Sequence, residues 1–418
     1  MPSSDSASNW SGSFVAEKLT EALKVKGSLK SWEAGNIGVG LGFLSEIVKL
    51  KLTWYEGSSA QLPGSVVLKV SGMENALANF GKLHETPECG AASAANPNAA
   101  AELIQEKMAE FQDFLVSAHN KEMQIYRMFA DSPPLPMPKF YYGAPWSDES
   151  KGVIIMEDLS DEATMVNAAD GFSVDQIKSV SEALASLHAR SFTMDPAPLK
   201  EKFPNVLEID PLNEGTHMTH MKMTAMQLMK LKGDWFQPLW SEVEAAFNRE
   251  GFLVSSESYK DLGIPPVLLQ GDLWGPNVLF ERDANGEATA KVAAIIDWQM
   301  PRMGSIMEDL ARLMGSSMDY QLRREYTSEI LAHYHEKLLA ACAAASVACP
   351  VTLDQVENAY EGIRQLTTLN LWFGVPLWAT MESVVGKKDD PKRPARVREM
   401  LMRAKSATEE WMELKKTN

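Results

Sequence analysis

The chain has few cysteines and fewer basic than acidic residues, and each of these two features excludes a class of protein. Its 418 residues contain three cysteines, too few and an odd number for the disulfide framework of a small secreted domain. On one continuous helix Cys342 and Cys349 would lie roughly 10 Å apart, beyond disulfide reach. The formal net charge is −16, whereas nucleic-acid binding needs basic patches that replace counterions. We therefore expect buried or idle thiols and no nucleic-acid partner.

Long apolar runs and targeting signals are also scarce. The longest candidate run, residues 338–349, is rich in alanine, ends before Pro350 and is far shorter than the roughly 20 apolar residues that span a bilayer. The first eight residues lack the basic and apolar regions of a secretory signal. We expect a soluble, cytoplasmic protein without a membrane span. The chain length suggests two or three domains, or one large two-lobed domain.

Three motifs with recognised chemistry are missing from the sequence. It contains no Gly-x-Ser-x-Gly elbow, no Walker A loop and no Cys-x2-Cys pair. Their absence removes the hydrolase, P-loop and zinc-ribbon interpretations. What the chain has instead is a pair of acidic loops, each entered from an apolar run. One lies within Leu269–Phe280, and the other begins where the run Val292–Ile296 ends in Asp297.

The spacing in the first loop points to phosphoryl transfer. Asp272 and Asn277 are separated by four residues, as are the catalytic-loop Asp and Asn of protein kinases. We expect Asp272 to act as the catalytic base that orients a substrate hydroxyl. Carboxylate and amide oxygens suit magnesium, so Asn277 and Asp297 are the candidate Mg²⁺ ligands. The alternative is two unrelated aspartates in loops that end strands.

Glycines near the amino end form a candidate phosphate-binding turn. Residues 14–29 have helical character, and Gly38, Gly40, Gly42 and Ser45 then precede a strand pattern over residues 46–54. Backbone amides at such a turn can approach phosphates, although a plain flexible turn is an equal alternative. The run is not a dinucleotide fingerprint, because its third glycine falls one residue early and a strand follows.

A lysine and a glutamate on buried faces form the second candidate pair. Lys69 sits inside the apolar strand pattern Ser65–Val70 and must reach solvent or find a partner. A long helix is predicted over residues 101–130, and Glu122 lies on its apolar stripe. Lys69 and Glu122 are therefore expected to pair and to position nucleotide phosphates. Glu106 and Glu110 are weaker candidates, and a solvent-facing lysine and an incidental glutamate remain alternatives.

A third strand pattern runs from residue 151 to Leu159 and ends in acids. Backbone groups near Met156, Glu157 and Leu159 are candidates for pairing with adenine, and a solvated strand end is the alternative. From Cys89 to Ala101 the sequence is rich in alanine, asparagine, glycine and proline, which indicates an insertion, and we expect this insertion to span residues 71–101. Beyond this strand the chain is predicted to be mostly helical.

Together these residues resemble the choline kinase-like and ecdysteroid kinase-like branch of the aminoglycoside phosphotransferase superfamily, which has a protein-kinase-like fold. The features that carry the resemblance are Asn36–Ser45, Val67-Leu-Lys69, Glu122-x3-Tyr126, Met156-Glu-Asp-Leu159, Ala183–Ala189, Gly271-Asp-Leu-Trp-x2-Asn277, and Ile296-Asp-Trp-Gln299 followed by Asp309-Leu-Ala311. The resemblance implies the roles proposed above, a bracing role for Asp309 and a small-molecule alcohol acceptor. One departure is Gln270, where members of the branch usually have histidine.

The sequence thus predicts an α+β, bilobal, protein-kinase-like fold. Residues 1–158 are expected to form a nucleotide-binding lobe with an antiparallel sheet, and residues 159–418 a helical lobe with the catalytic loop and the acceptor site. The predicted activity is transfer of the γ-phosphoryl group of ATP, with Mg²⁺, to a steroid-like alcohol or a glycoside; a choline-like or ethanolamine-like acceptor is a further option. No protein substrate is expected, because the Asp-Phe-Gly and Ala-Pro-Glu motifs are missing. The alternative is an inactive pseudokinase that binds or regulates.

Overall fold

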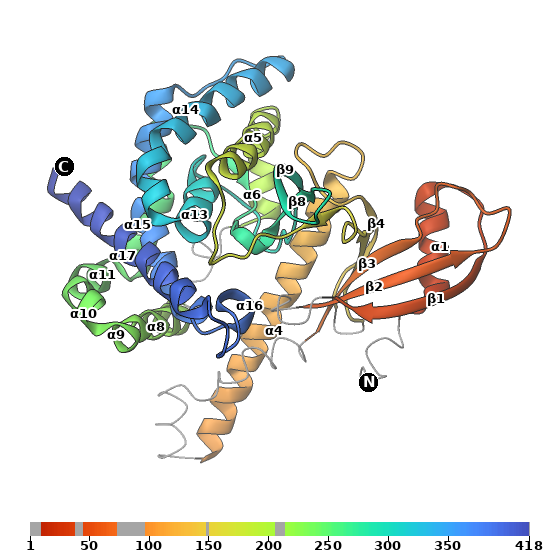
Figure 1. Ribbon diagram of the computed structural model, residues 1–418, viewed down its shortest axis with the longest axis horizontal. Helices are drawn as coiled ribbons and strands as arrows, with labels where there is room; N and C mark the ends of the chain where they lie inside the picture. Colours follow the sequence, from red (N-terminus) through yellow and green to blue (C-terminus); the bar gives the residue numbers. More distant parts are fainter. Residues whose placement is uncertain (1–9, 38–44, 73–96, 148–149, 205–213, 418) are drawn as a thin grey trace. The chain divides into compact units, whose positions relative to one another are not determined.

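The structure, a computed structural model, describes residues 10–37, 45–72, 97–147, 150–204 and 214–417 (Figure 1). The chain divides into two compact units. The first comprises residues 1–132 and 138–161, and the second comprises residues 133–137 and 162–418. The predicted α+β class is confirmed, since the first unit is built on an antiparallel sheet and the second is mainly helical. The assignment of nucleotide binding to residues 1–158 and of the acceptor site to residues 159–418 stays a prediction.

A five-stranded sheet forms the centre of the first unit. Its strands are β1 (Leu29–Asn36), β2 (Ser45–Trp54), β3 (Ser65–Ser71), β4 (Phe140–Ala144) and β5 (Val153–Glu157). They are arranged in the order β1-β2-β3-β5-β4, and every neighbouring pair is antiparallel. Strand β5 is buried over its first four residues because it lies inside the sheet.

The two faces of this sheet have different roles. Helix α1 (Gly12–Leu23) packs on one face, where its apolar residues share a core with Leu68 and Val70 of β3. Side chains alternate along a strand, so Lys69 points to the opposite face. That face meets α4 (Pro97–Met128), the helix that carries Glu122. The alternation in β3 therefore separates an apolar core from a buried charge.

The first helix and the strand after it differ from the sequence prediction. The amino-terminal helix was expected over residues 14–29, but α1 begins after the N-cap Ser11 and ends at Leu23, before the C-cap Lys24, whose backbone is left-handed. The residues that follow form β1, which the sequence did not predict. Seven of the eight residues of β1 are exposed, so its sequence has no apolar alternation to reveal it.

Two small sheets in the second unit support the acidic loops. Strands β6 (Ala163–Thr164), β8 (Val278–Arg282) and β9 (Ala288–Ile295) form an antiparallel sheet in the order β6-β8-β9. Strands β7 (Val267–Leu269) and β10 (Arg302–Gly304) form a second antiparallel pair. All three residues of β7 are fully buried, which anchors the loop that follows it.

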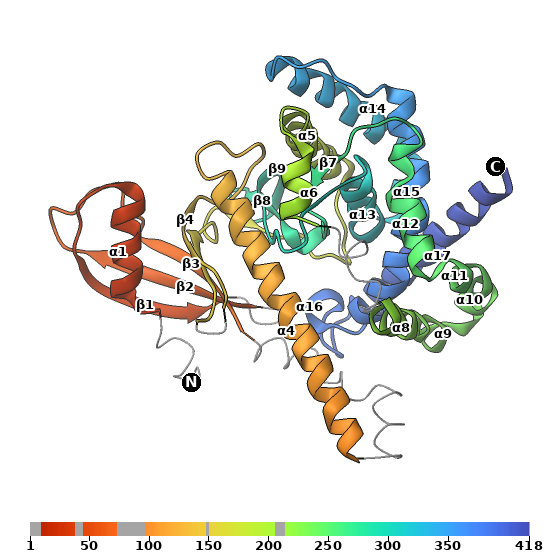
Figure 2. The same cartoon turned by 180° about the vertical axis from the view of Figure 1, so that it is seen from behind.

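Helices make up the rest of the second unit (Figures 1 and 2). They are α5 (Val174–Ser191), α6 (Pro196–Lys202), α8 (Glu214–Ala225), α9 (Gln227–Leu231), α10 (Gly233–Phe236), α11 (Trp240–Ala246), α12 (Arg249–Ser256), α13 (Glu308–Ser317), α14 (Tyr320–Ala344), α15 (Leu353–Trp378), α16 (Glu382–Val385) and α17 (Arg393–Thr417). Helix α5 packs against α14 and β9, and α15 packs against α12, α13 and α17. No described helix has the length and apolar character needed to cross a bilayer.

A buried arginine ties α17 to the region of the acidic loops. The side chain of Arg403 is fully buried, and its guanidinium donates to the carbonyl oxygens of Ala168 at 2.6 Å, Ala169 at 3.0 Å and Ser316 at 2.6 Å. Glu399 supplies its counter-ion. Because Ser316 lies near the carboxyl end of α13, this arginine holds that end of the helix in place.

The two described cysteines do not share a helix. Helix α14 ends at Ala344, Ser346 adopts a left-handed conformation, and the N–H of Val347 donates back to the carbonyl of Cys342. Burial raises the pKa of the Cys342 thiol to about 12, and the neighbouring Cys349 thiol adds to this shift. Both thiols are free, but the separation expected for a continuous helix was wrong.

Candidate active site

Strand pairing brings the two acidic loops of the second unit together. The first loop follows β7 and enters β8, and the second follows β9. Val278 of β8 pairs with Ile295 of β9, and just beyond this pair the N–H of Ile296 donates to the carbonyl of Asn277 at 3.0 Å. Asn277 and Asp297, the two predicted magnesium ligands, are therefore held at the same end of one sheet.

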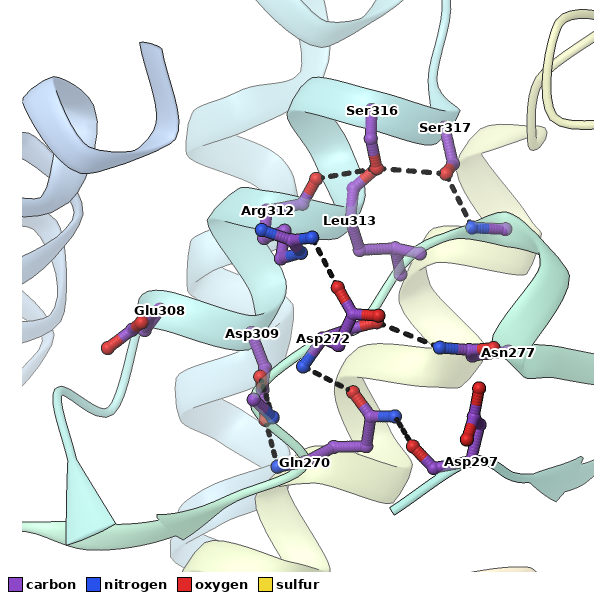
Figure 3. A network of polar contacts seen from close by, with 12 residues as sticks. Gln270, Asp272, Asn277, Asp297, Glu308, Asp309, Arg312, Leu313, Ser316 and Ser317 are labelled. Atoms are coloured by element: carbon purple, nitrogen blue, oxygen red, sulfur yellow. Dashed lines mark hydrogen bonds and ion pairs between the residues drawn. The ribbon is translucent and has the colours of Figure 1, made fainter. Parts of the chain in front are cut away.

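Asp297 adopts an unusual backbone conformation. Its φ angle is +62°, in the left-handed region, which costs energy for residues other than glycine and is tolerated best by Asn and Asp. In Figure 3 its carboxylate points toward the side of the loop on which Asn277 lies. Strained backbone of this kind is concentrated at functional sites, and here it accompanies a carboxylate at a strand end.

The amide of Gln270 links both loops. Its Oε1 accepts from the N–H of Asp272 at 2.8 Å, and its Nε2 donates to the carbonyls of Ile296 at 3.1 Å and Asp297 at 2.7 Å. The residue is fully buried. The side chain that departs from the usual histidine therefore fixes the positions of Asp272 and Asp297 (Figure 3).

Asp309 braces the start of the same loop. Its two carboxylate oxygens accept from the backbone N–H groups of Gln270 at 2.6 Å and Gly271 at 2.9 Å. Burial raises the pKa of Asp309 to about 6, although these two hydrogen bonds oppose the shift. Gly271 has a φ of +86°, and a Cβ there would lie 1.9 Å from the carbonyl oxygen of Met300. The loop therefore requires glycine at this position.

Asp272 lies at the centre of the cluster. The Nδ2 of Asn277 donates to its carbonyl oxygen at 2.9 Å, which leaves the Oδ1 of Asn277 available to a cation. The Asp272 side chain is 37% exposed, so its carboxylate is accessible. Loss of solvation nevertheless raises its pKa; the Arg312 guanidinium opposes this shift and the Asp297 carboxylate adds to it.

Sequence reasoning missed one residue of this cluster, Arg312. Its Nη2 donates to the Oδ1 of Asp272 in an ion pair. The residue lies on α13, one helical turn after Asp309, so the two side chains share a helix face. That spacing was the available signal, because the bracing role implied for Asp309 already placed this face of α13 against the loop.

The first unit contains the predicted lysine and glutamate pair. The Nζ of Lys69 lies 2.7 Å from the Oε2 of Glu122, and both side chains are buried, with 8% and 1% of their surface exposed. The solvent-facing alternative for Lys69 was therefore wrong. The side chains of the weaker candidates, Glu106 and Glu110, lie outside the described residues.

The predicted adenine-pairing segment follows β5. Met156 is buried in the sheet, whereas the N–H of Glu157 donates to the carbonyl of Lys139 at 2.9 Å. The side chain of Asp158 is 1% exposed and pairs with Lys49 at 2.7 Å. Burial opposes ionisation of Asp158, but hydrogen bonds led by that from Lys49 hold its pKa at about 2. Asp158 is thus not part of a solvated strand end, and it fixes the segment that contains Leu159.

The predicted phosphate-binding turn is only partly visible. Gly38, Gly40 and Gly42 lie outside the described residues. Ser45 starts β2 opposite Ser71 and is 4% exposed, and its hydroxyl has no hydrogen-bond partner among the described residues.

The cation-binding potential of the second unit depends on Asn277 and Asp297. No group of three or more His, Cys, Asp or Glu side chains suited to a metal occurs among the described residues. A magnesium ion commonly takes one or two protein oxygens and completes its shell with water and phosphate. The oriented amide oxygen of Asn277 and the carboxylate of Asp297 fit this partial donor set.

Two proteins of Caenorhabditis elegans are similar in sequence. One, named "Uncharacterized oxidoreductase dhs-27", is 30% identical over 266 residues, which are 61% of this chain and 32% of that protein. The chain therefore spans about a third of that relative. The other, named "Uncharacterized kinase-like protein D1044.1", is 26% identical over 272 residues, which are 64% of this chain and 68% of that protein.

Solved structures are similar only at low identity. An ethanolamine kinase of Plasmodium vivax is 12% identical, with a TM-score of 0.42 and coverage of 90% of this chain and 82% of its own. A GDP complex of an aminoglycoside 2'-phosphotransferase is 11% identical, with a TM-score of 0.43 and coverage of 95% and 99%. A family profile described as "DUF1679: Uncharacterized oxidoreductase dhs-27" matches residues 14–409, and the chain belongs to this family.

Proposed function

We propose that the protein is an ATP-dependent kinase that phosphorylates a hydroxyl group of a small molecule. The observation that carries the proposal is a hydrogen-bonded arrangement in which Gln270 contacts both Asp272 and Asp297, and Asn277 contacts Asp272. The buried Lys69 and Glu122 pair of the first unit adds a second element of the same chemistry. The kinase-like name of one relative supports the superfamily, while the narrower choline and ecdysteroid kinase-like branch stays a prediction.

Asp272 has the properties that the base requires. In phosphoryl transfer the protein mainly positions the groups and stabilises charge, so the base needs orientation more than strength. The backbone N–H and carbonyl of Asp272 are both fixed by side-chain amides, and its carboxylate is partly exposed. It would accept a hydrogen bond from the acceptor hydroxyl and take the proton late in the reaction.

The remaining residues would hold the nucleotide and its cation. Asn277 and Asp297 would bind Mg²⁺, which neutralises phosphate charge and orients the γ-phosphoryl group when bound. Lys69, kept in place by Glu122, would contact the α- and β-phosphates. Backbone groups near Met156, Glu157 and Leu159 would pair with the adenine, and Gly38, Gly40, Gly42 and Ser45 would approach the phosphates.

The acceptor is proposed to be a steroid-like alcohol or a glycoside. Aromatic residues of the second unit divide into two groups. Trp372 and Phe236 are fully buried and belong to the core, whereas Trp378 is half-buried and stacks on Trp274 with ring centroids 5.0 Å apart. Trp274 is buried and follows Asp272 by two residues, so the half-buried Trp378 that stacks on it would offer a flat apolar face to an acceptor near the base. A choline-like acceptor remains the alternative.

Two other functions fit the structure less well. A pseudokinase would be favoured if Gln270 left the catalytic loop disordered, but that side chain forms the contacts that order both acidic loops. An oxidoreductase with a dinucleotide-binding domain requires a parallel sheet with flanking helices. Every strand pair in the sheets of the described residues is antiparallel. The oxidoreductase name belongs to a relative of which the match covers 32%.

The test is Mg²⁺-dependent release of ADP from ATP with a panel of steroid, glycoside and amino-alcohol acceptors, accompanied by nucleotide binding measured separately. We expect acceptor-dependent turnover that Asp272→Asn loses while it retains ATP binding. Nucleotide binding without turnover on any acceptor would favour the pseudokinase. Failure to bind nucleotide would refute the proposed function.

A further inference from the structure

The ion pair between Arg312 and Asp272 places a cation next to the proposed base. Arg312 donates through Nη2 to the Oδ1 of Asp272. No other described side chain or backbone group hydrogen-bonds to this carboxylate, so Oδ2 is the oxygen presented to an acceptor. A hydroxyl bound to Oδ2 would therefore lie within a few ångströms of the guanidinium.

Arg312 and the candidate cation ligands approach Asp272 from different directions. Figure 3 shows Arg312 reaching the carboxylate from α13, whereas Asn277 and Asp297 lie on the other side of the loop. The phosphates and Mg²⁺ would occupy the side of Asn277 and Asp297. The side of Arg312 is therefore left to the acceptor.

The guanidinium has donor capacity that the described protein does not use. Arginine has five N–H donors, and the contact of Arg312 with Asp272 uses Nη2 alone. Its Nε is buried without a hydrogen-bond partner among the described residues, and the side chain is 21% exposed. Glu308, one helical turn before Arg312, forms its ion pair with Arg302, and the Arg312 charge adds a weaker attraction to it. Arg312 can thus bind a further group while it keeps its contact with Asp272.

We propose that Arg312 selects acceptors by their charge. The enzyme would then use alcohols that are neutral or carry an anionic group near the hydroxyl, and it would discriminate against cationic amino alcohols. This inference rests on the proposed kinase function. A guanidinium repels an ammonium group at close range and binds a carboxylate or phosphate with two parallel hydrogen bonds. Choline-like and ethanolamine-like acceptors, left open above, are thereby disfavoured.

The experiment compares acceptors that share a scaffold and differ in charge. Three sets are used: ethylene glycol, ethanolamine and glycolate; methyl glucoside, aminoethyl glucoside and glucuronate; and a neutral, an amino-substituted and a carboxylate-bearing steroid alcohol. The kcat/KM for ADP release is measured with the full chain, Arg312→Gln and Arg312→Lys. The lysine variant is the matched control, because it retains the positive charge and loses the planar fork.

For the wild type we expect the cationic member of any scaffold that turns over to be used at least about tenfold less efficiently than the neutral member. Arg312→Gln should reduce this difference to within about threefold, and Arg312→Lys should keep most of it. Purely structural loss of Arg312 would lower kcat/KM for all members of a set equally, which would overturn the proposal.

The remaining outcomes separate this inference from the proposed function. Turnover that prefers the cationic member, or a charge preference unchanged in Arg312→Gln, overturns the role of Arg312 and leaves the kinase function standing. If the wild type binds ATP but shows no acceptor-dependent turnover, both the role of Arg312 and the proposed kinase function are refuted. If Arg312→Gln does not fold, as judged by thermal unfolding, the wild-type kcat/KM values within each set decide. A lower value for the cationic member than for the neutral member supports the proposal, and the reverse order overturns it.

Discussion

The side chain of Gln270 holds the backbone of Asp297, with its Nε2 donating to the Asp297 carbonyl at 2.7 Å. Its Oε1 accepts from the N–H of Asp272 at the same time. One neutral amide thus sets the distance between the proposed base and a proposed cation ligand. Because the amide carries a donor and an acceptor, it does so without a proton that could be lost or gained near neutral pH.

Replacement of this amide by an apolar group should disorder the loops. Gln270→Leu leaves the N–H of Asp272 and the carbonyls of Ile296 and Asp297 without their partner in a buried setting. We expect a loss of roughly 2–4 kcal/mol in the free energy of unfolding and a fall in kcat of about tenfold or more. Gln270→His is the control, since an imidazole keeps one donor or acceptor for each loop. Wild-type kcat in Gln270→Leu would show that the amide does not position the site.

The buried pair in the first unit allows stability and activity to be separated. Lys69→Met leaves Glu122 without this counter-ion, and breaking a buried ion pair costs about 3–5 kcal/mol. The double variant Lys69→Met/Glu122→Gln removes both charges, so it should recover most of the stability measured by thermal unfolding. It should still lack Mg²⁺-dependent ADP release, because the phosphate contact of Lys69 is gone. A double variant with wild-type turnover would contradict the nucleotide role of the pair.

Much of the site was predictable because its residues carry local signals. Asp272, Asn277 and Asp297 each follow or precede an apolar run, and strand pairing alone brings their loops together. Lys69 could be predicted from its position inside an apolar strand, since a buried charge requires a partner. These inferences depend on short-range sequence patterns and on the energetic cost of burying polar groups.

The features that sequence reasoning missed depend on tertiary contacts or on exposure. Strand β1 is exposed along seven of its eight residues, so burial imposes no regular apolar alternation by which the strand could be recognised. Arg312 reaches Asp272 from a helix that lies forty residues later in the chain. The turn that ends α14 before Cys349 depends on a left-handed residue, Ser346. Because this residue is not glycine, the sequence did not indicate that the helix ends there.

Gly271 offers a test of loop geometry. Gly271→Ala combines an unfavourable positive φ with a Cβ 1.9 Å from the carbonyl of Met300, so the backbone of the loop must move. We expect kcat to fall by about tenfold or more, because small displacements of reacting groups are costly. Gly286→Ala is the matched control. It has a similar φ of +83°, but its Cβ would approach no atom closer than 3.7 Å, and it lies in the turn between β8 and β9.

For Gly286→Ala we expect only the cost of the left-handed conformation, about 1–2 kcal/mol, with turnover unchanged. Equal effects of the two substitutions on kcat would show that conformational strain alone, and not the position of the catalytic loop, accounts for the loss. Thermal unfolding and ADP release on the same preparations distinguish these results.

The pH dependence of turnover should report the environment of Asp272. Loss of solvation raises the pKa of this carboxyl, and the Arg312 guanidinium opposes the shift. A base must be deprotonated, so kcat/KM falls as the pH drops through this pKa, and the acid limb should lie above the usual carboxyl range near 4.

Removing the Arg312 guanidinium removes an influence that lowers the pKa of Asp272. The acid limb of Arg312→Gln should therefore move to higher pH, whereas that of Arg312→Lys should stay near the wild-type position because the positive charge is kept. The measurement is kcat/KM for the best acceptor from pH 4 to 8, and an acid limb that does not move in Arg312→Gln would mean that this guanidinium does not control the ionisation of the base.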